Sequence, residues 1–262
     1  MRRHILILGG TTEARQLAQQ LAPRTDIAVT LSLAGRTVSP LAQPVPIRSG
    51  GFGGIAGLAR YLRDEAVYAL IDATHPYAAT ISAHAVEAAG QTHTPMIALR
   101  RPPWAAVAGD RWTEVLDAKD AVQGLGIAPR RVFLALGRQE IAPFAAAPQH
   151  HYLIRSVDPV QPPLAVPHAR YIEERGPFGE EEERALLAEH AIEVVVAKNS
   201  GGQATYGKIA AARALGIAVL LIRRPADPGG RRVSDVSEAI AWLDQVLGTD
   251  AHAPGTELDR GV

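Results

Sequence analysis

Short apolar segments alternate with amphipathic segments along almost the whole chain. The apolar segments have the length of buried strands, and the segments between them carry apolar residues at helical spacing. Regular alternation of this kind is typical of α/β proteins, in which helices cover a mostly parallel sheet. We therefore predict an α/β fold with mostly parallel sheets.

The same pattern predicts where the elements lie. Strands are expected at 4–8, 27–33, 67–71, 95–99, 131–136, 151–155, 169–173, 192–197 and 217–222. Helices are expected at 13–22, 54–63, 77–89, 117–124, 139–146, 180–190, 203–215 and 235–247. Proline-rich segments at 40–46, 158–167 and 225–230 are expected to be surface loops, and residues 249–262 a disordered tail.

The stretches 97–126 and 220–248 resemble each other. In each, an apolar strand is followed by Arg-Arg-Pro, a polar loop and a helix that ends near a glycine. An internal duplication would give two similar α/β lobes, which we place at 1–126 and 127–248, with a ligand cleft between them. The alternative is that two α/β halves share only the general pattern of their class.

The composition excludes several classes of protein. Lys and Arg number 27, and Asp and Glu also number 27, so the chain has no overall basic field for nucleic acid. No apolar run approaches the ~18 residues of a membrane span, and the chain enters its first strand without a signal peptide. The absence of cysteine excludes disulfides and thiol chemistry, and His84 and His93 lack metal-ligand spacing with His75. We expect a cytoplasmic protein that binds no nucleic acid, membrane or metal.

The first candidate binding site is the turn between strand 4–8 and helix 13–22. A buried strand, a glycine turn and a helix N-terminus bring free backbone N–H groups together, and these favour a phosphate-bearing cofactor. The residues of this turn are Gly9, Gly10, Thr11, Thr12 and Glu13. The threonines can cap the helix, and the carboxylate suits its positive end. The turn is not the G-x-G-x-x-G fingerprint, so a glycine that only turns the chain stays an alternative.

The end of the second strand predicts which cofactor this is. An acid at this position binds the free 2′-hydroxyl of NAD, whereas an arginine accommodates the 2′-phosphate of NADP. No acid lies between Ile27 and Pro46. The candidate residues are Ser32, Gly35, Arg36 and Thr37. We favour the phosphate role of Arg36 over the alternative of a solvated turn.

Two further segments of the first lobe carry candidate ligand residues. The cluster that begins at Gly50 contributes Gly51, Phe52, Gly53 and Gly54, which permit close backbone approach and ring stacking. Strand 67–71 is followed by Asp72, Thr74 and His75, at the sheet edge where α/β proteins bind ligands. A flexible loop is the alternative for the glycines, and a cap of helix 77–89 is the alternative for Asp72.

The second lobe has basic residues and neutral donors at its own strand ends. They are Gly137, Arg138, Gln139, Arg175, Lys198, Asn199, Ser200, Gly201, Gly202 and Tyr206. Such a set suits carboxylates, although each basic residue could instead be solvated or part of a surface ion pair. Tyr206 and Lys208 are two residues apart, which is not the spacing of the short-chain dehydrogenase pair.

Six motifs in this order resemble those of the precorrin-6A reductase family, over about residues 4–247. They are Leu-Gly-Gly-Thr-Thr-Glu-Ala (8–14), Gly-Gly-Phe-Gly-Gly (50–54), Asp-Ala-Thr-His-Pro (72–76), Gly-Arg-Gln-Glu (137–140), Arg-Gly-Pro-Phe (175–178) and Lys-Asn-Ser-Gly-Gly (198–202). The resemblance implies a two-lobed, Rossmann-like enzyme of cobalamin biosynthesis. Such enzymes use NADPH to reduce one ring double bond of a corrinoid macrocycle, giving precorrin-6B.

The residues agree with that role, because a macrocycle with acetate and propionate arms suits a basic second lobe. The proton that completes the reduction could come from His75, Tyr206 or Lys208, or from water or a substrate carboxylate. Other enzymes of the pathway are conceivable partners. Three alternatives stay open: an NADPH-dependent reductase or epimerase of another carboxylated substrate, a non-catalytic NADP-sensing protein, and a transferase that uses the glycine loops for another anion.

Overall fold

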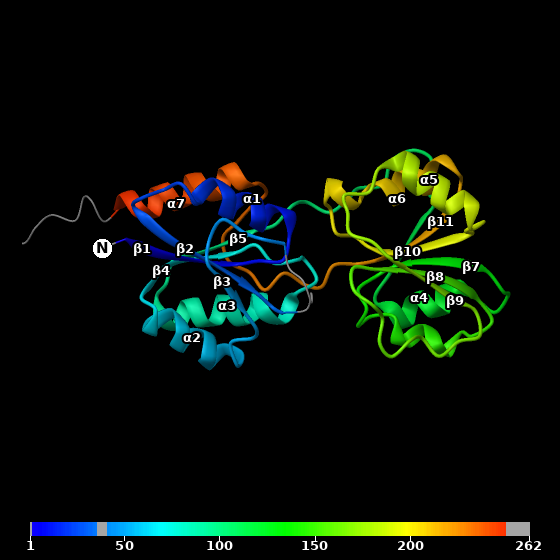
Figure 1. Ribbon diagram of the computed structural model, residues 1–262, viewed down its shortest axis with the longest axis horizontal. Coiled ribbons are helices and arrows are strands. Elements are labelled where there is room, and N and C mark those ends of the chain that lie inside the picture. Colours follow the sequence, from blue (N-terminus) through cyan, green and yellow to red (C-terminus); the bar gives the residue numbers. More distant parts are fainter. Residues whose placement is uncertain (1, 36–40, 250–262) are drawn as a thin grey trace, which may run out of the picture. The chain divides into compact units, whose positions relative to one another are not determined.

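The computed structural model describes residues 2–35 and 41–249, and these form two compact units (Figure 1). Unit 1 comprises the described residues up to Gly35, 41–101 and 226–249, and unit 2 comprises 102–225. Within this part of the chain, no helix is both long and apolar enough to cross a bilayer.

Unit 1 is built on a six-stranded parallel sheet with the order β12-β5-β4-β1-β2-β3. Its strands are β1 (Arg3–Leu8), β2 (Ile27–Leu33), β3 (Ile47–Ser49), β4 (Val67–Asp72), β5 (Met96–Leu99) and β12 (Arg232–Val233). Counted from the edge strand β3, this is the 3-2-1-4-5-6 order of dinucleotide-binding folds, with β12 as the sixth strand.

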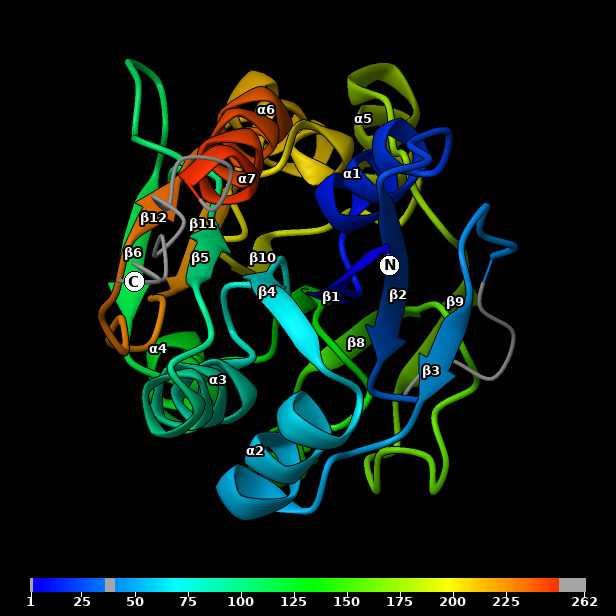
Figure 2. The same cartoon turned by 90° about the vertical axis from the view of Figure 1, so that its left-hand side faces the viewer.

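Helices cover both faces of the sheet in unit 1 (Figure 2). One face is covered by α1 (Thr12–Leu21) and α7 (Val236–Thr249), and the other by α2 (Gly54–Asp64) and α3 (Ala79–Thr92). The apolar positions of α1 at helical spacing, which include Leu17 and Leu21, are fully buried in one core with Trp242 and Leu243 of α7.

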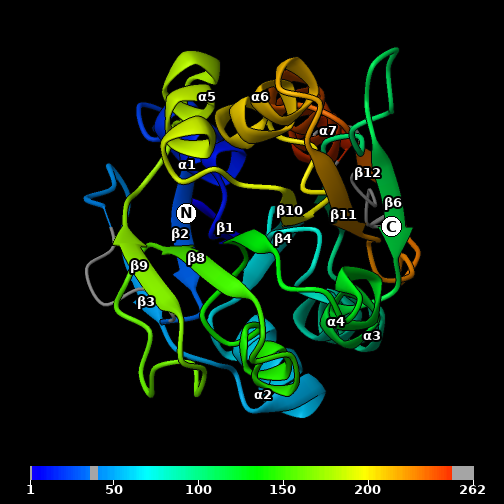
Figure 3. The same ribbon diagram turned by 90° about the vertical axis from the view of Figure 1, so that its right-hand side faces the viewer.

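Unit 2 repeats this plan with the order β6-β11-β10-β7-β8-β9, again all parallel. Its strands are β6 (Trp112–Val115), β7 (Arg131–Ala135), β8 (His151–Ser156), β9 (Ala169–Glu173), β10 (Val194–Lys198) and β11 (Ala218–Ile222). One face carries α5 (Glu180–Glu189) and α6 (Gly207–Ala214), and the other carries α4 (Ala118–Leu125) (Figure 3). The 3₁₀ turns η1 (Ala142–Ala146) and η2 (Gln203–Thr205) complete the unit.

The sheet of unit 1 takes its sixth strand from beyond a chain crossing, whereas unit 2 is one continuous stretch of the described chain. After β5 the chain passes into unit 2, where β6 and α4 follow, and after β11 it returns to unit 1 with β12 and α7. The two crossings are the Arg-Arg-Pro segments at 100–102 and 223–225. The sequence repeat therefore spans a crossing in both copies, and the two units share one strand order.

The prediction of two α/β units with parallel sheets is confirmed, but the division differs from the boundary expected at 126. The sequence places β6 and α4 in the first half of the chain. Hydrogen bonds to β11 place β6 in unit 2, and α4 packs against these two strands. A linear pattern cannot show this, because strand pairing joins residues that are distant along the chain.

The predicted elements agree closely with the structure, apart from the short edge strands. The pattern misses β3, β6 and β12, which have few residues and little burial. The predicted helix 139–146 is the 3₁₀ turn η1, and helix 203–215 divides into η2 and α6. The expected tail begins at Thr249, which ends α7, and the rest of the tail lies outside the described residues.

Close packing at Gly57 generates a stability prediction. A Cβ atom at Gly57 in α2 would lie 1.7 Å from the carbonyl oxygen of Phe52, whereas a Cβ atom at Gly90 in α3 would contact nothing. Gly57→Ala should therefore lower the free energy of unfolding by about 1–3 kcal/mol. Gly90→Ala should raise it by about 0.5–1 kcal/mol, because alanine favours the helix. Urea denaturation checks both changes, and equal stability of the two variants would contradict the packing argument.

Candidate functional site

The carboxyl ends of the parallel strands in unit 1 meet at one edge of the sheet. The direction of the chain reverses between β1 and β4, since β1 leads to β2 on one side and β4 leads to β5 on the other. Ligands of open α/β sheets bind in the crevice at such a switch point. The loops that follow β1 and β4 are two of the candidate segments predicted from the sequence.

The turn after β1 is a glycine turn into a capped helix, as predicted. Gly10 has φ +117, a conformation that favours glycine, and the next residue, Thr11, is the N-cap of α1. Thr11 Oγ1 accepts a hydrogen bond from the backbone N of Ala14 at 3.1 Å and donates one to the carbonyl oxygen of Ala73 at 2.8 Å. The N-terminus of α1, with Thr12 as its first residue, is therefore fixed against the end of β4.

The other residues of this turn are held by neighbouring strands. The backbone N of Gly9 donates to the carbonyl oxygen of Ser32 at 2.8 Å, which ties the end of β1 to the end of β2. Glu13, in the first turn of α1, forms an ion pair with Arg101 at the first crossing. The first N–H groups of a helix have no partner inside it, so this end of α1 presents donors at the switch point.

The end of β2 and the strand beside it form a second part of the edge. Ser32 is buried and lies opposite Arg48 of β3 in the strand register. The backbone N of Gly50 donates to the carbonyl oxygen of Leu33 at 2.9 Å, so the glycine cluster begins directly beside the turn after β2, where Gly35 lies. Arg36 and Thr37 lie outside the described residues.

Arg48 organises the glycine cluster. Its guanidinium donates to the carbonyl oxygens of Gly50 at 2.6 Å and Gly51 at 2.8 Å, and it stacks 3.7 Å from the ring centroid of Phe52. The rings of Phe52 and Tyr61 also form an edge-to-face pair, with their centroids 5.2 Å apart. The guanidinium of Arg48 therefore already stacks on the Phe52 ring, the ring for which ligand stacking is predicted. The cluster ends in α2, with Gly53 as its N-cap and Gly54 as its first residue.

Asp72 fixes the loop after β4. Its side chain is 1% exposed, and Oδ1 accepts hydrogen bonds from the backbone N of Thr74 at 3.0 Å and its Oγ1 at 2.7 Å. Oδ2 forms an ion pair with Arg100, which also donates to the carbonyl oxygen of Thr74 at 2.8 Å. The alternative role as a helix cap is wrong, because α3 begins at Ala79 and has no side-chain cap.

His75 lies in the same loop and is half-buried. Its Nδ1 accepts a hydrogen bond from the backbone N of Tyr77 at 3.3 Å. The ring centroids of His75 and Tyr77 are 5.5 Å apart. A neutral imidazole that accepts at Nδ1 carries its proton on Nε2. Of the three residues predicted to supply a proton, His75 is the one placed in a switch-point loop of unit 1.

Unit 2 has the corresponding reversal between β7 and β10. Lys198, the last residue of β10, forms an ion pair with Glu140, whose Oε2 accepts a hydrogen bond from the backbone N of Gly137 at 3.0 Å. The predicted loops after β7 and β10 are thus brought together. Between Gly137 and Glu140 in the loop after β7, Arg138 is half-buried and Gln139 is exposed. Arg175 is exposed in the turn after β9.

The rest of the loop after β10 holds the first crossing. The Asn199 side chain accepts from the backbone N of Trp104 at 2.7 Å and donates to its carbonyl oxygen at 2.9 Å. A Cβ atom at Gly201 would lie 1.9 Å from the carbonyl oxygen of Pro102, so only glycine fits there. Ser200 and Gly202 are buried beside them. The predicted substrate role of Asn199 therefore competes with a structural role.

Arg224 of the second crossing binds the same loop. Its guanidinium donates to the carbonyl oxygens of Asn199 at 2.8 Å, Ser200 at 3.0 Å and Pro102 at 3.1 Å. Sequence reasoning did not select Arg48, Arg100, Arg101 or Arg224 as site residues. The signal available for the last three was the repeated Arg-Arg-Pro, whereas Arg48 lies on a strand that the apolar pattern does not reveal.

Tyr206 and Lys208, the other predicted proton donors, lie inside unit 2. The hydroxyl of Tyr206 accepts a hydrogen bond from Arg213, and its ring packs on Trp104. Lys208 is 5% exposed, and its Nζ donates to the carbonyl oxygen of Thr205 at 2.5 Å. Burial lowers the pKa of Lys208 to about 7, and the positive charge of Arg155 adds to this shift.

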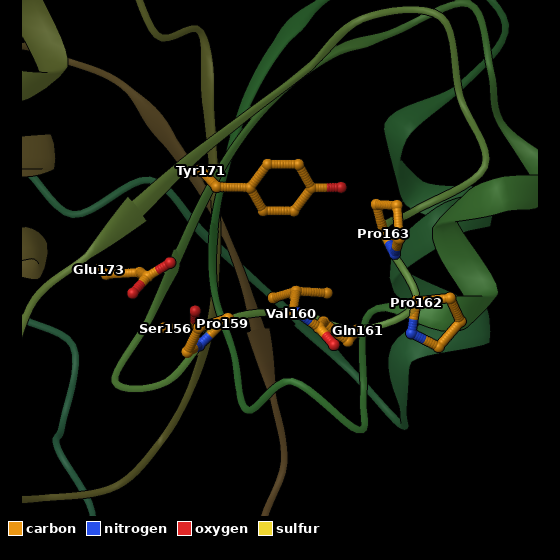
Figure 4. A pocket seen from close by; sticks show the side chains of 8 residues that line it. All are labelled: Ser156, Pro159, Val160, Gln161, Pro162, Pro163, Tyr171 and Glu173. Atoms are coloured by element: carbon orange, nitrogen blue, oxygen red, sulfur yellow. The ribbon is translucent and has the colours of Figure 1, made fainter.

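An open pocket of about 400 Å³ lies at the end of β8 and β9 (Figure 4). Its walls are largely apolar, and Tyr171 is placed across from Pro162 and Pro163. The Tyr171 hydroxyl accepts a hydrogen bond from the backbone N of Leu164 at 2.8 Å. The segment 158–167, predicted as a surface loop, therefore folds back as one wall of this pocket.

The strand order, the glycine turn and the helix N-terminus at the switch point define a Rossmann-type α/β protein. The family model described as precorrin-6x reductase CbiJ/CobK matches residues 4–244. The precorrin-6A reductase of Sinorhizobium sp is 58% identical over 248 residues, which are 95% of this chain and 92% of that protein. That of Rhodobacter capsulatus is 52% identical over 239 residues, 91% of this chain and 95% of its own length.

A solved structure of CobK precorrin-6A reductase has the same fold, with a TM-score of 0.89 and 50% identity. The match covers 93% of this chain and 97% of that one. The chain belongs to the precorrin-6x reductase family, as its six ordered motifs predicted.

The buried ammonium of Lys208 generates a pH prediction. Its pKa falls from 10.5 in the unfolded chain to about 7 in the folded chain, so between these values the unfolded chain binds more protons. Stability from this group therefore rises with pH across that interval, by at most about 1.4 kcal/mol per pH unit. Lys208→Met should remove this rise.

Urea denaturation of the wild type and Lys208→Met from pH 6.5 to 9.5 measures the difference. Lys119→Met is the matched control, because Lys119 is exposed and its replacement should leave the pH dependence parallel to that of the wild type. A constant difference between Lys208→Met and the wild type across this range would show that Lys208 does not change its pKa on folding.

Proposed function

We propose that this protein catalyses the NADPH-dependent reduction of one ring double bond of precorrin-6A to give precorrin-6B, a step of cobalamin biosynthesis. The observation that carries the proposal is the glycine turn and α1 N-terminus at the switch point of unit 1, in a chain that belongs to the precorrin-6x reductase family. A nicotinamide coenzyme, when bound, supplies the hydride.

The residues present at this edge fit a dinucleotide. Because Gly10 has no side chain, a ligand can approach the backbone of the turn closely. The first N–H groups of α1 suit a diphosphate. From Ile27 to Gly35, a stretch described in full, β2 and its turn carry no carboxylate that would repel a 2′-phosphate. Ser32 in this segment and Arg36, the next residue of the sequence after it, suit such a phosphate.

The chain's other loops bind and orient the substrate in this proposal. Precorrin-6A carries carboxylate arms, for which Arg138, Arg175 and Lys198 at the strand ends of unit 2 are suitable partners. His75 is our candidate for moving the proton, because its Nε2–H is a donor in the switch-point loop of unit 1. In this proposal Tyr206 and Lys208 have structural roles, since the Tyr206 hydroxyl accepts from Arg213 and Lys208 Nζ donates to the carbonyl oxygen of Thr205.

An anaerobic assay of the purified protein with precorrin-6A tests the proposal, with NADPH and NADH compared. Oxidation of NADPH and a product heavier by two hydrogens are expected. Binding of NADPH without turnover of precorrin-6A would instead support a non-catalytic NADP-binding protein. Failure to bind either coenzyme would overturn the assignment of the glycine turn.

Replacement of Arg36 tests the coenzyme preference. Because a charge-assisted contact to the 2′-phosphate contributes about 1.5–3 kcal/mol, Arg36→Ala should weaken NADPH binding by about tenfold or more. NADH binding, measured by fluorescence titration in the same way, should change little. Equal loss for both coenzymes would contradict the 2′-phosphate assignment.

Replacement of Lys198 tests the substrate role of unit 2. Lys198→Ala should raise the KM for precorrin-6A by about tenfold, because a charged contact to a carboxylate arm is lost. The dissociation constant of NADPH should stay unchanged. Arg184→Ala, at an exposed position of α5, serves as the control for loss of one positive charge. A loss confined to NADPH binding would show that Lys198 belongs to a different site.

A further inference from the structure

Arg48 places a fixed positive charge at the end of β2. It is half-buried on β3, directly opposite Ser32 in the register, and its Nη1 lies 3.5 Å from Ser32 Oγ. The two carbonyl oxygens of the glycine cluster and the ring of Phe52 hold the guanidinium in one orientation. A guanidinium held in this way loses little conformational entropy when it binds a further group.

No carboxylate among the described residues forms an ion pair with Arg48. Its hydrogen-bond partners are neutral carbonyl and hydroxyl oxygens, which leave its charge uncompensated. A fork of N–H donors with an uncompensated charge is suited to an anion, and to a phosphate above all.

Unit 2 provides an internal comparison. There Arg155 of β8 stacks 3.7 Å from the ring centroid of Phe178, which also precedes an N-cap glycine and a helix. Arg155 is 6% exposed, and both of its terminal nitrogens bind the carboxylate of Glu183. In unit 2 the arginine that stacks on phenylalanine is buried, and a carboxylate neutralises its charge. In unit 1 the corresponding arginine is half-buried, and no described residue neutralises its charge.

We infer that Arg48, together with Ser32, forms part of the subsite for the 2′-phosphate of the dinucleotide and so determines the preference for NADPH. This inference rests on the proposed function. Ser32 Oγ and the N–H groups of Arg48 lie at the carboxyl end of β2. In folds of this strand order, residues at this end bind the ribose 2′-hydroxyl or 2′-phosphate of the dinucleotide. The structural contacts of Arg48 hold it ready for that role.

Calorimetric binding of two nucleotides tests the inference without turnover. The ligands are 2′,5′-ADP, which carries the 2′-phosphate, and 5′-AMP, which lacks it. For Arg48→Met, the affinity for 2′,5′-ADP should fall about tenfold more than the affinity for 5′-AMP. Arg48→Lys, which keeps the charge but not the fork, should lose less of this ratio. Arg60→Met, at an exposed position of α2, should leave the ratio unchanged.

The outcomes separate this inference from the proposed function. If the wild type binds the two nucleotides equally, the NADPH preference fails and the role of Arg48 fails with it. If the wild type prefers 2′,5′-ADP and Arg48→Met keeps that preference, only the role of Arg48 is wrong. Equal loss of both ligands would show that Arg48 only supports the glycine cluster. Thermal unfolding of each variant confirms that it is folded, and Arg48→Lys serves where Arg48→Met does not fold.

Discussion

The sheet of unit 1 depends on a sixth strand and a helix that the chain supplies only after it has passed through unit 2. In unit 1 the segment that returns after β11 supplies β12 and α7, and α7 places Trp242 and Leu243 in the same core as Leu17 of α1. Because burial of such side chains stabilises a core by roughly 1.5–3 kcal/mol each, unit 1 needs the last part of the chain to complete its interior. The apparent halves of the sequence are therefore not the units that fold.

Arginines at the crossings connect this architecture to the candidate site. Arg100 binds Asp72 and Thr74 in the loop after β4, Arg101 binds Glu13 at the start of α1, and Arg224 binds the loop after β10. Breaking a buried pair such as Asp72–Arg100 leaves a charge without compensation, at a cost of about 3–5 kcal/mol. The arginines of the two crossings therefore bind the loops that carry the ordered motifs of the sequence. This contact gives the repeated Arg-Arg-Pro a structural role.

The sequence predicted the local structure of the candidate site where that structure depends on neighbouring residues. Gly10 and Thr11 were readable because a glycine turn and an N-cap are local features, determined by backbone geometry and by the next few residues. Contacts with distant partners could not be read in this way. Asn199 is predicted to bind substrate and Lys208 to supply a proton, and the structure adds that Trp104 holds the side chain of Asn199 and that Lys208 is buried in unit 2.

The sequence by itself determined the class of fold, the family and the segments that reach the strand ends, because periodicity, turn chemistry and ordered motifs are encoded locally. Only the tertiary structure decided which strands complete each sheet and which arginines are neutralised. Arg155 and Arg48 show this contrast. Both stack on a phenylalanine, yet of the two only Arg155 forms ion pairs within the described residues, with Glu183 on α5 and with Glu174. Whether a charge is compensated depends on contacts between distant residues, and these exist only once the chain is folded.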